Sequence, residues 1–279
     1  PGVCRMRVNL YRQMDRFAAA IRIIPDRIPA MKEIYLPKAC YAFTQLRKGL
    51  VLVTGPTGSG KSTTLAAMID HINQSRRCHI LTIEDPIEYR YQSKFAMVSQ
   101  RELSLDTLSF EMALRHSVRQ DPDVILLGEM RDLETMQIAI TLAETGHLTF
   151  STLHTSDSGQ TVSRIVDSFP PHQQAQIRSQ LSASLEGIVC QQLLPLKDKR
   201  GRVAAREVLV CTRAVKNLIR EGKLAQISSA IQTGADVGMI PMNFSLGHLY
   251  KSGFISYETA YAAAFDQPAF EHKYGASRL

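Results

Sequence analysis

Long apolar runs, paired cysteines and dense basic blocks are all missing from this sequence of 279 residues. No stretch approaches the roughly 18 consecutive apolar residues that a membrane-spanning helix needs. No basic start is followed by an apolar stretch and a small-residue cleavage site, so nothing resembles a secretion signal. With 44% hydrophobic and 21% charged residues, the composition is that of a globular protein, long enough for one α/β domain and a smaller partner.

The cysteines do not form a recognisable pair or metal-binding pattern. The five residues are Cys4, Cys40, Cys78, Cys190 and Cys211. Their number is odd, and no two have the C-x-x-C spacing of a zinc ribbon. Disulfide frameworks belong to oxidising compartments. We therefore expect isolated thiols in a reducing cytoplasm.

The net charge of +7 permits an anionic partner such as nucleic acid, lipid head groups or an acidic protein. Lysines and arginines gather only in short clusters, such as Lys197, Lys199, Arg200 and Arg202. A short cluster that contains a glycine is typical of a solvated loop. No recognisable nucleic-acid-binding module accompanies it, so we expect no direct nucleic-acid partner.

Strands and helices are predicted to alternate from Gly49 onward. Apolar runs typical of strands lie at residues 50–54, 79–83, 123–127 and 148–152, and helical patterns lie at residues 61–74, 109–119 and 133–144. The almost wholly apolar run at residues 123–127 is expected of a strand buried on both faces. The alternation predicts an α/β fold with a doubly wound parallel sheet.

The segments on either side of this core have weaker patterns. Residues 3–9 and 19–24 predict two strands, and residues 30–47 predict a helical approach that Pro37 interrupts. Beyond about residue 160 the chain is predicted to be mostly helical. The expected helices are 171–188, 213–221, 223–232, 242–251 and 256–264, and the expected strands are 191–194 and 203–209. Proline, glycine and charges from Asp266 onward predict a flexible tail.

A glycine-rich segment follows the first strand of the core. Its residues are Gly55, Pro56, Thr57, Gly58, Ser59, Gly60, Lys61 and Ser62, and Thr63 comes next. Every fixed position of the pattern G-x-x-x-x-G-K-[ST] is filled, and the segment opens an amphipathic helix. Glycines let backbone amides converge on phosphate oxygens, and the helix N-terminus adds positive potential. We therefore predict a nucleoside triphosphate here, with Lys61 on the β- and γ-phosphates and the Ser62 hydroxyl on Mg²⁺.

Carboxylates end two of the predicted strands. The strand from Asp123 ends at Glu129, and residues 83–88 contain Glu84, Asp85 and Glu88. Ligands of open α/β sheets bind at the carboxyl ends of strands. We expect Glu129 to act on the attacking water or on a water bound to Mg²⁺, and the second group to polarise water or hold a hydrated metal. The alternatives are a helix cap at Glu129 and a solvated acidic turn.

A histidine follows a third predicted strand. His154 comes just after residues 148–152, at the strand end where a γ-phosphate can be reached. We therefore expect His154 to sense the phosphate. His147 precedes the same strand, so we expect it to be structural.

Together these segments resemble the secretion-ATPase superfamily, which drives type II secretion and type IV pili. Residues 55–62 are similar to its Walker A motif, residues 83–89 to its Asp box, residues 123–132 to its atypical Walker B motif and residues 144–155 to its His box. The resemblance implies a RecA-like P-loop core that hydrolyses ATP with Mg²⁺. It also implies that Glu84 and Glu129 are the catalytic carboxylates and that His154 contacts the γ-phosphate.

Within the superfamily, the sequence is most similar to the pilus-retraction ATPases. Their AIRNLIRE motif corresponds to residues 214–221, with Val215 in place of Ile and Lys216 in place of Arg. The matching positions are Ala214, Asn217, Leu218, Ile219, Arg220 and Glu221. The paired-cysteine zinc insert of the assembly ATPases does not occur in the sequence. The resemblance implies a motor for pilus retraction and twitching motility, either the main motor or its accessory paralogue.

Other readings stay open at this point. Another secretion-type ATPase and a nucleic-acid-translocating RecA-like motor are alternatives, as is a regulator that binds ATP without hydrolysing it. A nucleic-acid motor predicts hydrolysis that DNA stimulates with a steep salt dependence. A regulator predicts no release of phosphate.

The resemblance also divides the chain into regions. Residues 1–24 correspond to the remnant of a longer PAS-like N-terminal domain, so we expect the chain to be truncated there. Residues 25–48 correspond to a linker and helix, residues 49–210 to the RecA-like ATPase core, residues 211–265 to a helical C-terminal region and residues 266–279 to the flexible tail. Hinges are expected near residues 22–30.

The resemblance further implies a homo-hexamer with ATP held between subunits. An arginine delivered across an interface can accelerate phosphoryl transfer by about 10³-fold or more. The candidates are Arg7, Arg16, Arg22 and Arg131, with Arg115 and Arg119 as further ones. The ring is expected to turn an inner-membrane pilus platform protein. This implies a cytoplasmic location at the inner face of a bacterial cytoplasmic membrane, peripheral to it through that partner.

Overall fold

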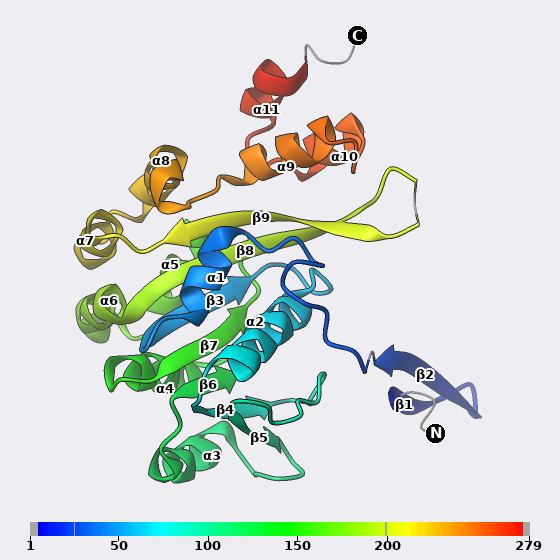
Figure 1. The fold of residues 1–279 in the computed structure, drawn as a ribbon, viewed down its shortest axis with the longest axis vertical. Coiled ribbons are helices and arrows are strands. Elements are labelled where there is room, and N and C mark those ends of the chain that lie inside the picture. Colours follow the sequence, from blue (N-terminus) through cyan, green and yellow to red (C-terminus); the bar gives the residue numbers. More distant parts are fainter. Residues whose placement is uncertain (1–4, 25, 199, 276–279) are drawn as a thin grey trace.

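The computed structural model describes residues 5–24, 26–198 and 200–275, and within these ranges the side chains of residues 114–118 are left aside. A central sheet lies between two layers of helices, and a two-stranded hairpin lies apart from it (Figure 1). The predicted start of the first strand at residues 3–4, Lys199 and the last four residues of the predicted tail lie outside the described residues.

The central sheet has seven strands in the order β5-β4-β6-β7-β3-β8-β9. Their bounds are β3 (Gly49–Thr54), β4 (His79–Glu84), β5 (Met97–Glu102), β6 (Val124–Leu127), β7 (Leu148–Leu153), β8 (Leu185–Pro195) and β9 (Arg202–Val210). Every neighbouring pair is parallel except β8 and β9, which form an antiparallel hairpin. The predicted α/β fold is confirmed. Because parallel strands share one carboxyl edge, β3, β4, β6 and β7 all end on the same side.

Helices cover both faces of this sheet, which explains the continuous apolar strands. β3, β6 and β7 are buried at every residue. On one face Val51 and Val53 pack with α1 (Lys38–Thr44) and α2 (Lys61–Ser75). On the other face Leu50 and Leu52 pack against a second group of helices. That group is α3 (Phe110–Ser117), α4 (Leu133–Glu144), α5 (Ser158–Asp167), α6 (Pro171–Ser184), α7 (Arg213–Glu221) and α8 (Ile227–Thr233).

Two predictions around the core were wrong in extent. The predicted helix at residues 171–188 ends at Ser184, because β8 begins at Leu185 and pairs with β3. Pairing with a central strand outweighs the helical pattern of these few residues. The helical approach predicted for residues 30–47 is a helix only from Lys38 to Thr44, since Pro37 stands at its N-cap.

The clearest error of the sequence prediction concerns the C-terminal helices. The predicted flexible tail holds α11 (Gln267–Tyr274), in which Phe270 is fully buried. The side chain of Asp266 accepts a hydrogen bond from Ala269 N at 3.0 Å, which caps the helix. Together α11, α9 (Met242–Lys251) and α10 (Tyr257–Ala263) make a small third core on the β8–β9 hairpin. The proline and the charged residues of this segment favoured a loop in the sequence prediction, so the burial of Phe270 was missed.

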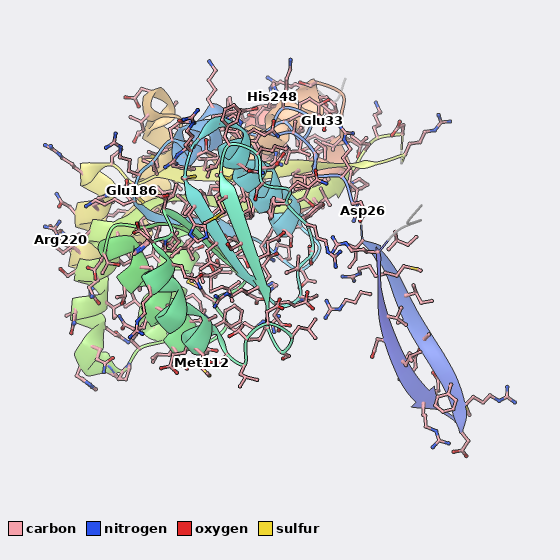
Figure 2. All side chains as sticks on the ribbon, turned by 60° about the horizontal axis from the view of Figure 1, so that its bottom comes forward. Asp26, Glu33, Met112, Glu186, Arg220 and His248 are labelled. Atoms are coloured by element: carbon pink, nitrogen blue, oxygen red, sulfur yellow. The ribbon has the colours of Figure 1, made fainter. Side chains whose placement is uncertain are left out.

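The N-terminal hairpin consists of β1 (Arg5–Gln13) and β2 (Arg16–Ile24). Both predicted strands are present, and each is longer than predicted. Met14 and Asp15 form the turn with φ of 48° and 58°, the left-handed geometry that suits the twist of a two-residue hairpin. Figure 2 shows the hairpin projecting from the core, with Asp26 at its base. Within the described ranges, every helix is too short or too polar to span a bilayer.

We predict that α11 contributes to stability rather than fraying. Phe270→Ala removes a fully buried ring, so the free energy of unfolding should fall by about 3–4 kcal/mol. Phe265→Ala, at a ring that is 43% exposed, is the matched control and should change it by under about 1 kcal/mol. Equal melting temperatures for the two variants would restore the prediction of a flexible tail.

Candidate phosphate-binding and catalytic site

The turn between β3 and α2 has the shape of a phosphate-binding loop. Gly55, Gly58 and Gly60 have φ of 139°, 79° and 86°, which side chains disfavour. A Cβ at Gly55 would lie 2.2 Å from the carbonyl oxygen of Gln191, so only glycine fits there. The N-terminus of α2 begins at Gly60 without a side-chain cap. Its first amides therefore stay available to an anion.

A buried glutamine, absent from the sequence prediction, holds this loop in place. The side-chain amide of Gln191 donates to Ser59 O at 2.7 Å and accepts from the Thr64 hydroxyl at 2.9 Å. Gln191 lies on β8 and is 1% exposed. It therefore ties the loop and the first turn of α2 to a neighbouring strand. Because its partners are 132 and 127 residues away, no local pattern could have indicated it.

Lys61 curls over the loop that it follows. Its Nζ donates to Gly55 O at 2.8 Å and to Pro56 O at 3.2 Å, and it lies 3.3 Å from His154 Nδ1. Burial lowers the pKa of Lys61, while the charges of Glu129 and Glu88 oppose that shift. The ammonium group is thus the positive centre of a site that carboxylates surround.

Two of the three predicted catalytic residues are connected to this lysine, His154 directly and Glu129 through His154. His154, just after β7, places its Nε2 at 2.8 Å from Glu129 Oε1, just after β6. Arg131 Nε donates to the other oxygen of Glu129 at 3.0 Å, and its guanidinium lies 3.9 Å from Asp85 Oδ2. The side chains of Lys61, His154, Glu129 and Arg131 therefore form one connected chain across three strand ends.

Glu84 ends the next strand, β4, and is held separately. Its Oε1 accepts from the Thr82 hydroxyl at 2.7 Å and from Gln100 Nε2 at 3.4 Å. Burial raises the pKa of Glu84 to about 7, although both hydrogen bonds favour the carboxylate. A Cβ at Gly128 would come 3.4 Å from Glu84 Cα, so the ends of β4 and β6 are close. Gln100, on β5, was not predicted from the sequence.

The two hydroxyls at the start of α2 have different surroundings. Thr63 Oγ1 lies 3.0 Å from the hydroxyl of Tyr89, which anchors the acidic loop after β4 to the helix. Ser62 is the second residue of α2 and offers a hydroxyl oxygen beside the loop. Across the described parts of the chain, no three His, Cys, Asp or Glu side chains gather as a metal site. Few oxygen ligands from protein suit Mg²⁺, which is held largely by phosphates and water.

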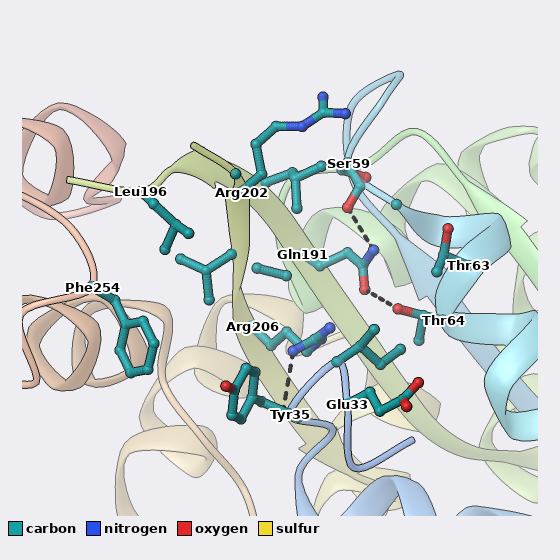
Figure 3. Close-up of a pocket in the computed structure, with 16 residues that line it drawn as sticks. Glu33, Tyr35, Ser59, Thr63, Thr64, Gln191, Leu196, Arg202, Arg206 and Phe254 are labelled. Carbon is teal, nitrogen blue, oxygen red and sulfur yellow. Dashed lines mark hydrogen bonds between the residues drawn. The ribbon is translucent and has the colours of Figure 1, made fainter. Parts of the chain in front are cut away.

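A cavity of about 520 Å³ adjoins the loop on the side of Thr63 and Thr64 (Figure 3). Tyr35, Gln191 and Arg206 are among the residues that line it. Arg206 is 5% exposed; it donates to Tyr35 O at 3.3 Å, and its Nε has no hydrogen-bond partner. Burial lowers the pKa of Arg206 to about 10. This Nε atom is itself buried and is not open to the cavity, but the guanidinium as a whole brings a positive charge to the cavity wall, which suits a polar ligand.

The predicted arginines fall in two places. Arg7, Arg16 and Arg22 are exposed on the hairpin, whereas Arg131 contacts Glu129 in the site itself. Arg119 is exposed, and the side chain of Arg115 is among those left aside.

The predicted retraction motif forms α7, whose ends have clear signals. Thr212 caps the N-terminus, and Gly222 ends the helix in the left-handed conformation. Val215 and Ile219 are buried, and Leu218 is half-buried; Ala214, Asn217, Arg220 and Glu221 face outward. Lys216 Nζ binds Glu186 Oε1 at 2.7 Å, a single contact that lysine makes as well as arginine.

The model of the protein family described as "Type II/IV secretion system protein" matches residues 35–237. The chain belongs to this family. It is 51% identical over 260 residues to the "Type IV pilus retractation ATPase PilT" of Pseudomonas aeruginosa, covering 93% of this chain and 75% of that protein. The match to the "Twitching motility protein" of Neisseria gonorrhoeae is also 51%, covering 93% and 70%.

A solved structure of the type II/IV secretion family has the same fold. The crystal structure of "the Pilus Retraction Motor PilT and Bound ADP" superposes with a TM-score of 0.90 at 50% identity, covering 97% of this chain and 77% of that one. The resemblance stated from the motifs is therefore confirmed at the level of the family and its fold.

We predict that ionisation of the buried Glu84 carboxyl lowers the stability of this protein at and above neutral pH. Its folded pKa of about 7 exceeds the ordinary value of 4.5, so stability falls as pH rises through this window and the buried carboxyl ionises. At pH 8, Glu84→Gln should raise the free energy of unfolding by up to about 3 kcal/mol. At pH 5 the gain should shrink to under about 1 kcal/mol. Denaturant unfolding at both values measures this, and a gain independent of pH would contradict it.

Proposed function

We propose that this protein is an ATP-hydrolysing motor subunit that powers retraction of a type IV pilus. One observation carries the proposal: Lys61 of the phosphate loop, His154 and Glu129 join in one chain of contacts. Support also comes from the 51% identity to a protein named as a pilus retraction ATPase. A P-loop by itself is evidence only for nucleotide binding. Acids at the strand ends and a histidine beside the loop are evidence for hydrolysis.

The loop and Lys61 are proposed to bind the triphosphate. Backbone amides from Gly55 to Ser62 receive its oxygens at the helix N-terminus. Lys61 exchanges its bonds to the Gly55 and Pro56 carbonyls for the β- and γ-phosphates, which are stronger partners for an ammonium group. Because Lys61 also touches His154, its movement releases the imidazole toward the γ-phosphate.

Glu129 is proposed to orient the attacking water. Its two oxygens are fixed by His154 and Arg131, which sets the direction of the carboxylate. Mg²⁺, when bound by the Ser62 hydroxyl and the phosphates with Glu129 acting through water, would neutralise charge on the transferred group. Glu84 is the second proposed catalytic carboxylate. A pKa of about 7 suits it to accept a proton near neutral pH.

The cavity beside the loop is proposed to hold the adenosine part of ATP. It opens from Thr63 and Thr64, where the chain of phosphates must lead away from the loop. Arg206, which lines the cavity, would present its guanidinium to an acceptor on the base or ribose. Because Arg206 is buried, a hydrogen bond to its charged group would be stronger than the same bond at the surface.

The assembly is proposed to be a homo-hexamer in which an arginine completes a neighbour's site. Arg7, Arg16 and Arg22 are exposed on the projecting hairpin and are candidates for this role, while Arg131 acts within its own subunit. Residues 49–210 are proposed as the ATPase core, residues 1–24 as part of an N-terminal domain, and residues 25–48 as the link. The C-terminal region 211–265 would extend through α11.

The proposed work is done on an inner-membrane pilus platform protein, from the cytoplasmic face of a bacterial membrane. The outward side of α7 supports this, because Asn217, Arg220 and Glu221 are exposed there (Figure 2 labels Arg220). Exposed polar and charged side chains of this kind suit the rim of a protein–protein interface.

We predict that Glu129→Gln binds ATP normally but hydrolyses it about 10²-fold more slowly, since the amide cannot act as a charged acceptor. Lys61→Ala should lose tight ATP binding outright. Phosphate release and equilibrium nucleotide binding measure the two effects. Turnover of Glu129→Gln within a few-fold of the parent would refute its role, and DNA-stimulated turnover would favour a nucleic-acid motor.

We predict that Arg206 contributes to binding of adenosine but not of phosphate. Arg206→Met keeps the apolar stem of the side chain but removes the guanidinium, and it should weaken ATP binding by about tenfold, the effect of one lost charged hydrogen bond. Binding of inorganic tripolyphosphate, which has no adenosine, should be unchanged. Calorimetry with both ligands tests this. Equal loss for both would mean that Arg206 supports the fold of the loop instead.

A further inference from the structure

The side chain of one hairpin residue reaches the acidic loop of the site. Arg5, at the start of β1, donates through its two terminal nitrogens to Ile87 O at 3.2 Å and to Glu88 O at 2.5 Å. Its Nε also lies 3.5 Å from Asp26 Oδ1, at the base of the hairpin. Further out on the same strand, Leu10 is 73% exposed. The contact at Arg5 therefore joins a projecting element to a loop that follows β4.

The same loop is held from the core side as well. Ile87 N donates to Glu102 Oε2 at 3.1 Å, and Gln100 Nε2 donates to Tyr89 O at 2.9 Å. The hydroxyl of Tyr89 lies 3.0 Å from that of Thr63 in α2. These bonds fix the loop relative to the phosphate-binding turn. Arg5 adds a support that comes from outside the core.

Two carboxylates depend on the position of this loop. Glu84 stands at its start, and Glu88 lies close enough to Lys61 for its charge to oppose the lowered pKa of that lysine. A small movement of the loop backbone would change the distances from both acids to the bound phosphates. Such distances decide rates of phosphoryl transfer, because catalysis there rests on positioning and charge.

We propose that Arg5 is a positioning residue that couples the angle of the N-terminal hairpin to the placement of Glu84 and Glu88. A guanidinium that donates to two successive carbonyls fixes direction as well as distance. Residues 26–30 lead from the hairpin side into the core, so turning the hairpin must either move the loop or break the contact. The coupling acts in both directions: nucleotide that shifts the loop also biases the hairpin. This inference rests on the proposed function.

Three variants of the whole chain test the coupling. Arg5→Ala removes both donors, and Arg5→Lys keeps the charge but not the fork. Arg12→Ala is the matched control on the same strand, where the guanidinium contacts only hairpin residues among its described partners, Asp15 and Phe17. Hydrogen exchange of the amides in residues 84–91, measured by mass spectrometry, reports the loop directly. ATP turnover and KM report the site.

In Arg5→Ala we expect exchange in residues 84–91 to rise by about tenfold, as loss of two charged donors would allow. We expect kcat to fall by about fivefold with KM unchanged, because placement rather than binding is lost. Arg5→Lys should lie between Arg5→Ala and the parent, and Arg12→Ala should match the parent.

Any of three results would overturn the coupling. One is exchange in the loop that stays at the parent level in Arg5→Ala; another is an equal change in Arg12→Ala. A rise in KM with unchanged kcat would also contradict it, since Arg5 would then serve binding. If the parent chain released no phosphate, the proposed function would fail, while the exchange experiment would still decide the role of Arg5.

Discussion

The buried side chain of Gln191 holds the phosphate loop to β8, and the rest of the site depends on that contact. One amide satisfies the Ser59 carbonyl and the Thr64 hydroxyl at 2.7 and 2.9 Å. The approach is so close that Gly55 has no room for a Cβ against the Gln191 backbone. With the loop fixed, the first amides of α2 take fixed directions, and Lys61 begins from a defined position on the Gly55 carbonyl. Every carboxylate of the site then acts on a charge whose place is set.

Several groups of the site are buried in ways that lower the stability of the ligand-free protein but suit them to binding and catalysis. Glu84 is buried with a raised pKa, Lys61 has a lowered one, and Arg206 keeps an unpartnered donor. Burial of such groups is costly unless a ligand satisfies them. A triphosphate would give Lys61 new acceptors, and the adenosine attached to it would lie against the guanidinium of Arg206. The hairpin contact through Arg5 places this balance under the influence of an element outside the core.

The sequence alone was sufficient to predict those parts of the molecule that depend on local patterns. The parallel strands, the glycine loop and the acids at strand ends follow from apolar runs and short motifs, and the structure brings His154 and Glu129 within 2.8 Å. Gln191 and Arg206 escaped prediction because their partners are distant in sequence. The burial of Phe270 was missed because it depends on packing between helices: its ring contacts Tyr257 of α10, and the same core includes residues of β8, β9 and α9. The local composition of its own segment indicated a loop.

A structure of the protein with Mg²⁺ and a non-hydrolysable ATP analogue would test the central claim most directly. The distance to measure is that from Lys61 Nζ to Gly55 O, which is 2.8 Å here. We predict that it lengthens beyond hydrogen-bonding range as Nζ turns to the β- and γ-phosphates, and that His154 leaves Lys61 for the γ-phosphate. An analogue bound with Lys61 still on the Gly55 carbonyl, and with Glu129 turned away from it, would contradict the account.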